Sequence, residues 1–462
     1  MTLIFSDFGM FNHNRTVIGV QPVLGATVIT PHLLVMKNAA ARAHNMPFGS
    51  VWSIYDLFTG RQAVRDVALK VADLQISDDY ARETPETFTS ADGRKILVTL
   101  RDKAFVGEVQ YFDVAGKLTQ KDIYDDGGFL MSRETPIAPD VVRAELLDAG
   151  GQPIFELTRR GRWGQISKVK YVPENLSFDS ENKALRWAFE QLVAKKSTDE
   201  RFLVASTQMR EALRESWYEP KGVALLLTER FSKSLDILFD HYEAVVFNNQ
   251  ADLKQAQLDY GERTQAKLAW NNFIASDHIQ RTFTADHRQI YLTLGAASEA
   301  LNYEKIADKI KEIFDYQPDL RMIIQVDGRK SRDNLVPHIK WRGAEQLDKI
   351  EFYANPNTSF IKRKITESML VINLTEHDLV AFDVAMAIAA HIPVLGLKDN
   401  AVMQTYISDD NGKLVSMDQL AMVAKEAVAN LGFYSRLADD LARKQETLSS
   451  DKTAERWSEI LE

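Results

Sequence analysis

The alternation of apolar and polar residues changes character twice along the 462-residue chain. In about the first 70 residues, it predicts isolated elements separated by an irregular loop that contains Asn, Gly and Pro. Between residues 74 and 172 the helical period disappears, and Asp/Gly clusters separate short runs that alternate like half-buried strands. The predicted elements of these two regions are strands at 3–5 and 51–55, a helix at 34–44, and strands at 96–100, 104–112, 129–133, 141–147 and 154–158.

After residue 172 the pattern becomes an alternation of helices and strands that continues to residue 397. Such an alternation indicates parallel sheets covered by helices. Residues 417–461 have the period of amphipathic helices. The clearest predicted elements are helices at 182–195 and 303–314 and strands at 202–205, 223–227, 244–247, 290–294, 321–326 and 350–353.

The strand-rich region repeats one turn motif. An apolar–Asp–x–x–Gly unit begins at Phe112, Tyr124 and Leu147, at spacings of 12 and 23 residues. The Asp carboxylate accepts hydrogen bonds from turn amides and Gly adopts positive φ, so each unit predicts a tight turn. A period close to 12 residues predicts an antiparallel meander, with coincidence among common turns as the alternative. We interpret the adjacent Asp125 and Asp126 as turn-capping residues rather than an acid–base pair, because neighbours in a strand point to opposite faces.

Composition excludes several classes of function. The net charge of −9 and the pI of about 5.6 argue against nucleic acid or anionic lipid as the main partner. No apolar run approaches the ~20 residues of a membrane span, and the N-terminus lacks the features of a secretory signal. The chain has no cysteine, its nine histidines lack a metal-binding spacing, and no GxSxG, P-loop or GxGxxG motif occurs. We therefore expect a cytoplasmic protein that binds neither a metal nor a cofactor.

Residues 369–397 predict a strand, a helix and a second strand. The segment resembles the donor half of retaining glycosyltransferases of the two-Rossmann type, which carry a Glu–x7–Glu pair there. Counting back from Pro393 places Met386 at the second Glu, which holds the ribose of the donor, and Asp378 at the first. A thioether cannot accept hydrogen bonds from ribose hydroxyls as a carboxylate does. The resemblance therefore implies a glycosyltransferase frame that has lost its donor site.

Residues 290–304 are similar to the strand, loop and helix that carry the diphosphate-binding Arg and Lys of the same enzymes. Aligned on Gly295, the family's Arg falls on Ala296 and its Lys on Leu301. An apolar side chain cannot neutralise the charge that develops on the leaving diphosphate. The resemblance thus implies a pseudo-glycosyltransferase without catalytic residues. The alternative is an unrelated α/β protein that never had a donor site.

A narrower resemblance comes from the turn at 124–130, YDDGGFL, and from the C-terminal half. The turn is similar to the YDDRGF motif of a small Gram-positive group: the O-GlcNAc transferase of serine-rich adhesins, its chaperone-like partner subunit, and the first of three accessory secretion proteins of the accessory Sec system. Matches to the secretion protein are RKITES at 363–368, LVINL at 370–374, IAAHIP at 388–393 and NGKLV at 411–415. Residues 1–50 match poorly, which keeps the chaperone subunit as an alternative.

The resemblance implies an α/β fold of the GT-B glycosyltransferase type, with two Rossmann-like domains and an inserted antiparallel β-meander domain. The expected C-terminal helices pack back on the N-terminal domain, with Trp457 and Ile460 as anchors. The expected boundaries are 1–75 and 173–262 for the N-terminal Rossmann-like domain, 76–172 for the meander, 263–435 for the C-terminal Rossmann-like domain, and 436–462 for the final helices.

The implied function is that of a non-catalytic component of an accessory Sec export complex. It would bind a serine-rich glycoprotein adhesin, other accessory secretion proteins and the accessory motor ATPase, and partners would hold it at the inner face of the membrane. The alternative is the acceptor-binding chaperone subunit of the adhesin O-GlcNAc transferase. Phe112, Tyr124 and Phe129 are candidates to stack on sugar or peptide, unless the meander serves only assembly and its aromatic residues are core.

Overall fold

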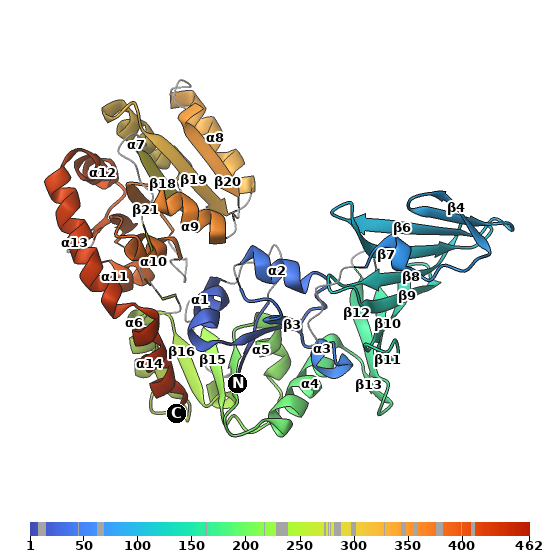
Figure 1. Ribbon diagram of the computed structural model, residues 1–462. Coiled ribbons are helices and arrows are strands. Elements are labelled where there is room, and N and C mark those ends of the chain that lie inside the picture. Colours follow the sequence, from blue (N-terminus) through green and yellow to red (C-terminus); the bar gives the residue numbers. More distant parts are fainter. Residues whose placement is uncertain are drawn as a thin grey trace. The chain divides into compact units, whose positions relative to one another are not determined.

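The computed structural model describes two compact units, shown from the N-terminus in blue to the C-terminus in red in Figure 1. Unit 1 comprises residues 1–12 and 27–219, and unit 2 comprises residues 13–26 and 220–462. The structure describes all residues except 8–14, 45, 62–68, 162–163, 217, 228–238, 272–273, 276, 278, 281–287, 297–301, 328, 343–347, 355, 357, 376–381, 399 and 408–411.

Unit 1 contains four parallel strands in the hydrogen-bonded order β14-β1-β2-β3. The strands are mostly buried, which is typical of a parallel sheet with helices on its faces. Their bounds are Thr2–Phe5 (β1), Thr27–Thr30 (β2), Val51–Ser53 (β3) and Arg201–Val204 (β14). The helices of this unit are α2 (Lys37–Ala43), α3 (Asp56–Thr59), the short 3-10 helix η1 (Val71–Asp73), α4 (Glu181–Lys195) and α5 (Thr207–Leu213).

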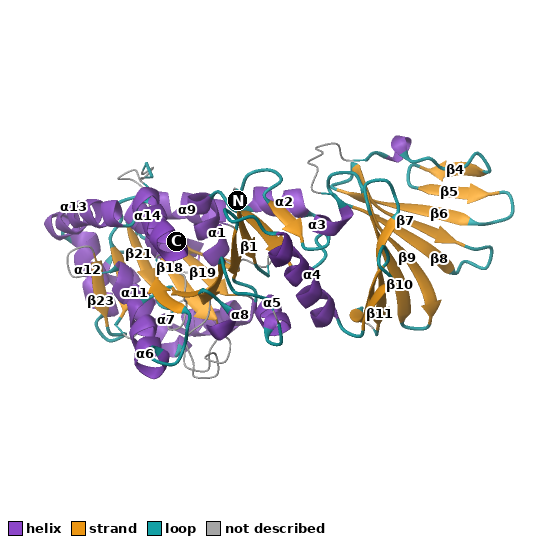
Figure 2. Ribbon diagram, turned by 90° about the horizontal axis from the view of Figure 1, so that it is seen from below, coloured by secondary structure: helices purple, strands orange, loops and turns teal. Residues whose placement is uncertain are grey.

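The remainder of unit 1 is a ten-stranded antiparallel sheet in which each strand pairs with its neighbours in sequence (Figure 2). The predicted meander is therefore confirmed. The alternation missed β4, β5, β8, β12 and β13; β8, for example, has the sequence LTQKDIY and buries only two of its side chains. The strands are β4 (Tyr80–Thr84), β5 (Thr87–Ser90), β6 (Lys95–Arg101), β7 (Phe105–Phe112), β8 (Leu118–Tyr124), β9 (Leu130–Ala138), β10 (Val141–Leu147), β11 (Pro153–Arg160), β12 (Gln165–Tyr171) and β13 (Leu176–Phe178).

The three repeated turns share one geometry. In each, an Asp Oδ1 accepts hydrogen bonds from the amides two and four residues later, at 2.8 to 3.0 Å. The Gly of each copy has a φ between 75° and 82°, which a side chain would disfavour. These positions are Asp113 with Gly116, Asp125 with Gly128, and Asp148 with Gly151. The predicted role of Asp and Gly in these turns is confirmed.

Aromatic rings join the meander to the helices of unit 1. Trp187 of α4 lies 5.4 Å from Phe58 of α3, with the two rings stacked. The same Trp187 ring lies 4.8 Å from that of Tyr171 of β12, and Tyr55 meets Phe155 of β11 edge-on at 5.2 Å. Such pairs stabilise beyond the burial of their area. They fix the last strands of the meander against α3 and α4.

Unit 2 contains a six-stranded parallel sheet in the order β20-β19-β18-β21-β22-β23. Numbered along the chain this order is 3-2-1-4-5-6, the arrangement of a Rossmann sheet. Its strands are β18 (Gln289–Ala296), β19 (Arg321–Asp327), β20 (Ile350–Ala354), β21 (Leu370–Asn373), β22 (Val394–Leu397) and β23 (Gly412–Val415). The helices that accompany it are α7 (Tyr303–Tyr316), α8 (Arg329–Arg342), α9 (Thr358–Thr366), α10 (Phe382–Ala389), α11 (Ala401–Tyr406), α12 (Leu420–Ala429) and α13 (Leu431–Thr447).

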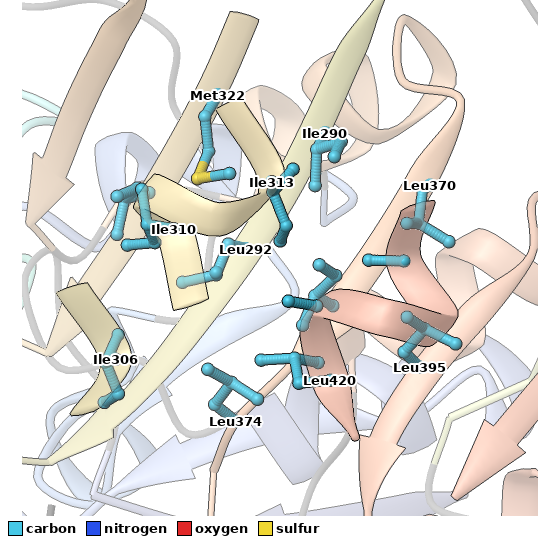
Figure 3. Close-up of a cluster of buried hydrophobic side chains, with 14 of the residues drawn as sticks. Ile290, Leu292, Ile306, Ile310, Ile313, Met322, Leu370, Leu374, Leu395 and Leu420 are labelled. Atoms are coloured by element: carbon cyan, nitrogen blue, oxygen red, sulfur yellow. The ribbon is translucent and has the colours of Figure 1, made fainter. Parts of the chain in front are cut away.

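The core of this sheet follows from the spacing of apolar residues (Figure 3). Ile306, Ile310 and Ile313 repeat at intervals of four and three residues, so they share one face of α7. That face packs in a cluster with strand residues such as Leu292 and with Leu420 of α12. All of these side chains are buried.

Unit 2 also contains α1 (Arg15–Leu24), β15 (Val223–Leu227), β16 (Ala244–Phe247), α6 (Gln250–Tyr260), β17 (Lys267–Trp270) and α14 (Ser450–Leu461). The sequence predicted an irregular loop after the first strand, but Arg15–Leu24 form the helix α1, so that prediction is wrong here. Burial of the Val17, Ile18 and Val20 side chains stabilises this helix and offsets the cost of Pro22 inside it. The C-terminal helix α14 contacts α1, and its Trp457 is fully buried.

The α/β fold with parallel sheets and a separate antiparallel sheet is as expected from the sequence. The expected domain boundaries stay predictions. Strand β17 begins at Lys267, beyond the expected end of the N-terminal Rossmann-like domain at residue 262, and it pairs in parallel with β16. In the part of the chain that the structure describes, no helix combines the length and apolar character needed to cross a membrane.

Candidate functional site

The order of the six-stranded sheet reverses between β18 and β21. In open α/β sheets, ligands bind outside the carboxyl ends of the strands at such a switch point. β18 ends at Ala296 and β21 ends at Asn373, and α10 is the next described helix after β21. We take these three elements as the candidate site.

A buried carboxylate lies at this switch point. Asp383, in the first turn of α10, is 1% exposed. Its Oδ2 accepts a hydrogen bond from Thr293 Oγ1 of β18 at 2.6 Å. Asn373 Nδ2 of β21 donates to both carboxylate oxygens, at 3.1 and 2.9 Å. Because a buried charge is costly without such donors, this arrangement holds α10 in one position against the two strands.

The same network continues toward α11. The Oδ1 of Asn373 accepts hydrogen bonds from the amide and hydroxyl of Thr375, at 3.0 and 2.6 Å. Asn400 donates to the Thr375 carbonyl at 2.7 Å and accepts from the amide of Met403 at 3.2 Å. Asn373, Thr375 and Asn400 are all buried. These polar groups bind one another, so they form a scaffold rather than an acid–base pair.

A second cluster of buried charges connects the meander to the segments around α2 and α3 of unit 1. Lys37, Asp56, Arg61 and Asp125 are between 0% and 6% exposed. Arg61 Nη2 lies 3.0 Å from Asp56 Oδ1, and Lys37 Nζ lies 3.6 Å from Asp56 Oδ2. Asp125 Oδ2 lies 3.8 Å from Lys37 Nζ and 4.0 Å from Arg61 Nη1. We call these four residues the anchor cluster.

The neighbouring Asp126 binds the N-terminus of α2. Its Oδ2 accepts a hydrogen bond from the amide of Ala39 at 2.7 Å, and its own amide donates to the carbonyl of Val35 at 3.1 Å. Burial raises the pKa of Asp125 and of Asp126. The interpretation as turn-capping residues holds for Asp125, whereas Asp126 caps a helix of the parallel layer. The sequence alone did not reveal this second role, because it depends on a contact 87 residues away.

The three aromatic candidates of the meander differ in exposure. Phe129, which follows the Asp125 turn in the sequence, is only 7% exposed and is therefore a packed, buried side chain. Phe112 and Tyr124 are half-buried, and Tyr124 packs against a core that includes Val98 and Val109. Burial raises the pKa of the Tyr124 hydroxyl. Their role in substrate binding stays a prediction.

No protein-family model matches the chain, and no curated protein is significantly similar in sequence. Solved structures match it over its whole length. The pneumococcal O-GlcNAc transferase GtfA in complex with UDP and GlcNAc is 14% identical, with a TM-score of 0.75 and 100% and 98% of the two chains covered. A mutant of TarM from S. aureus, in complex with fondaparinux, alpha-GlcNAc-glycerol and UDP, is 11% identical, with a TM-score of 0.76 and coverage of 100% and 99%.

The chain has a GT-B glycosyltransferase fold. A third structure that shares it contains accessory secretory proteins 1, 2 and 3 of Streptococcus pneumoniae, with 14% identity, a TM-score of 0.69 and coverage of 100% and 99%. The GT-B fold expected from the sequence is therefore confirmed. Both glycosyltransferases and accessory secretory proteins have this fold, so the fold alone does not decide between catalysis and export.

Two of the four expected donor positions of this GT-B chain lie in the described part. Ala296 is the last residue of β18 and is opposite Asp327 of β19 in the strand register. Met386 lies in the second turn of α10 and is half-buried. Leu301 and Asp378 lie outside the described residues. The loss of the donor site stays a prediction.

Asp383, which lies three residues before Met386, was not among the residues predicted from the sequence. A signal was available, because Asp383 is the only ionisable residue in the helical stretch FDVAMAIA. A charged residue in such an apolar helix requires a buried partner. Among the described residues, no group of His, Asp and Glu is arranged to hold a metal ion.

Proposed function

We propose that the chain is a non-catalytic, glycosyltransferase-like component of an accessory Sec export complex. It binds a serine-rich glycoprotein adhesin, other accessory secretion proteins and the accessory motor ATPase. It works in the cytoplasm, and its partners hold it at the inner face of the membrane.

Met386 on α10 carries the proposal. By the resemblance of residues 369–397 to donor-binding transferases, the half-buried thioether of Met386 falls where those enzymes carry a carboxylate. The nearest described carboxylate along the helix, Asp383, already accepts hydrogen bonds from Thr293 and Asn373. Its side chain is also only 1% exposed, so the ribose hydroxyls of a nucleotide sugar cannot reach it. The fold shared with accessory secretory proteins 1, 2 and 3 supports a place in export.

The first test is enzymatic. The purified chain is incubated with UDP-GlcNAc or UDP-Glc and a serine-rich acceptor peptide, and the release of UDP is followed. We expect no release above the buffer background. Turnover that the Asp378→Ala substitution abolishes contradicts the proposal.

The second candidate function is that of the acceptor-binding chaperone subunit of an adhesin O-GlcNAc transferase. The structure of a GtfA/B complex, with 14% identity and a TM-score of 0.71, favours it as the alternative. A pull-down decides between the two. Capture of accessory secretion proteins and of the motor ATPase supports export, whereas capture and stimulation of the catalytic transferase supports the chaperone function.

A further inference from the structure

A pocket of about 380 Å³ opens on the last three strands of the meander. Side chains from β11, β12 and β13 line it, together with Asp179, which directly follows β13. Thr158 and Lys168 are opposite each other in the β11–β12 register, so their side chains lie on the same face of the sheet. All the lining residues belong to the described part of unit 1.

The charges in this pocket do not cancel. Arg160 and Lys168 line it, and neither forms an ion pair or a side-chain hydrogen bond with another described residue. The single carboxylate of the lining, Asp179, lies 2.9 Å from Lys183 Nζ, which is bound to it by an ion pair. The hydrogen bond from Lys183 also holds the pKa of Asp179 below its usual value. The pocket therefore presents two unpaired cations and a carboxylate that is already neutralised.

The rest of the lining is rich in hydroxyl groups. Thr158, Ser167 and Ser177 come from three adjacent strands. The Ser167 hydroxyl donates to the Thr158 carbonyl at 3.2 Å, which leaves its oxygen free to accept. Hydroxyls of this kind match the mixed donors and acceptors of a sugar ring. The guanidinium of Arg160 offers the planar pair of donors that fits a phosphate.

We propose that this pocket binds a phosphorylated monosaccharide. Arg160 and Lys168 bind the phosphate, and the hydroxyls of Thr158, Ser167 and Ser177 bind the sugar ring. The volume lies at the lower end of the ~300–1,000 Å³ of small-molecule pockets, which suits one sugar unit rather than an oligosaccharide. The proposal goes beyond the proposed function and does not depend on it.

Calorimetry on the full chain tests the proposal with glucose 6-phosphate, glucose and inorganic phosphate as probes. We expect glucose 6-phosphate to bind at least about tenfold more tightly than either of the others, because both halves of the site contribute. The double substitution R160Q/K168Q lowers its affinity by at least about tenfold, since charge-assisted hydrogen bonds are lost. The control K95Q/K117Q removes the same charge from exposed positions of the same sheet and leaves the affinity within about twofold.

Three results overturn the proposal: no saturable binding of glucose 6-phosphate, equal affinity for inorganic phosphate, or an equal loss in the control variant. A phosphoserine peptide that binds more tightly than glucose 6-phosphate through the same two cations assigns the pocket to a polypeptide and overturns the sugar assignment. Ser177→Ala removes only an exposed hydroxyl, so it tests the sugar contact in a chain that folds even if the double variant does not.

Discussion

The anchor cluster predicts that the charge of Asp125 contributes to stability separately from its turn. Asp125→Asn keeps an Oδ1 acceptor for the amides of Gly127 and Phe129 but removes the negative charge. The cluster then holds the two cations Lys37 and Arg61 against the single carboxylate of Asp56. Asp148→Asn is the matched control, because Asp148 makes the same two turn hydrogen bonds at an exposed position.

The magnitude follows from the distances. Charges about 4 Å apart attract by about 4 kcal/mol at an effective dielectric constant of ~20. Asp125 makes two such contacts, at 3.8 and 4.0 Å, while its desolvation and the nearby Asp56 oppose them. Removal of one partner of a buried ion pair costs about 3–5 kcal/mol, because the remaining charge is uncompensated. Because burial raises the pKa of Asp125, its desolvation offsets these attractions, and Asp56 still compensates part of the cationic charge. We therefore expect a smaller loss of about 1–2 kcal/mol for Asp125→Asn, whose amide Nδ2 would face two cations, and a loss of less than about 0.5 kcal/mol for Asp148→Asn.

Urea unfolding at pH 7 measures both changes, followed by tryptophan fluorescence and far-UV circular dichroism. The two probes are needed because a chain with several domains does not necessarily unfold in one transition. Equal losses for the two variants would refute the reasoning, since the charge of Asp125 would then contribute nothing beyond the turn.

Burial raises the pKa of Asp126, so as the pH falls this carboxylate takes up its proton at a higher pH in the folded chain than in the unfolded chain. The wild type should therefore gain stability relative to Asp126→Asn as the pH falls from 7 toward the ordinary Asp pKa of about 4, and lose this gain as the pH rises again; an unchanged difference between the urea midpoints of the two proteins at pH 7 and at about pH 4 would contradict this. Trp457→Ala should destabilise α14 by about 3–5 kcal/mol in thermal unfolding, whereas Ser458→Ala at an exposed position should have little effect. Phe112→Ser should weaken adhesin binding in a pull-down more than Val114→Ser at the neighbouring turn, and equal binding by both variants counts against the meander as the substrate surface.

Local patterns predicted most of the fold. The spacing of Ile306, Ile310 and Ile313 was sufficient for α7, and Asp and Gly positions were sufficient for the repeated turns, because each depends on residues close in sequence. Elements with weak local signals were missed, such as α1 with its internal Pro22 and the polar strand β8. Tertiary contacts decide these elements.

The candidate site was predictable only in part. The resemblance to glycosyltransferases predicted roles for Met386 and Ala296, which lie on α10 and β18, two of the elements that meet at the switch point. The partners of Asp383 come from β18 and β21, 90 and 10 residues away, and no local pattern relates them. The second role of Asp126 was hidden for the same reason, since its acceptor oxygen serves a helix distant in sequence.

The strand order of unit 1 has a consequence for synthesis of the chain on the ribosome. Thr2 of β1 pairs with Arg201 of β14, so this strand pair cannot form until the ribosome has added 199 further residues. At ~5–20 residues per second, their synthesis takes ~10–40 s. Every meander strand pairs with the strand just before or after it, and such local pairing forms quickly. The antiparallel meander can therefore be complete before β14, the fourth parallel strand of unit 1, has been synthesised. The nascent chain acquires its antiparallel sheet first, and β1 remains unpaired with β14 until that sheet has formed.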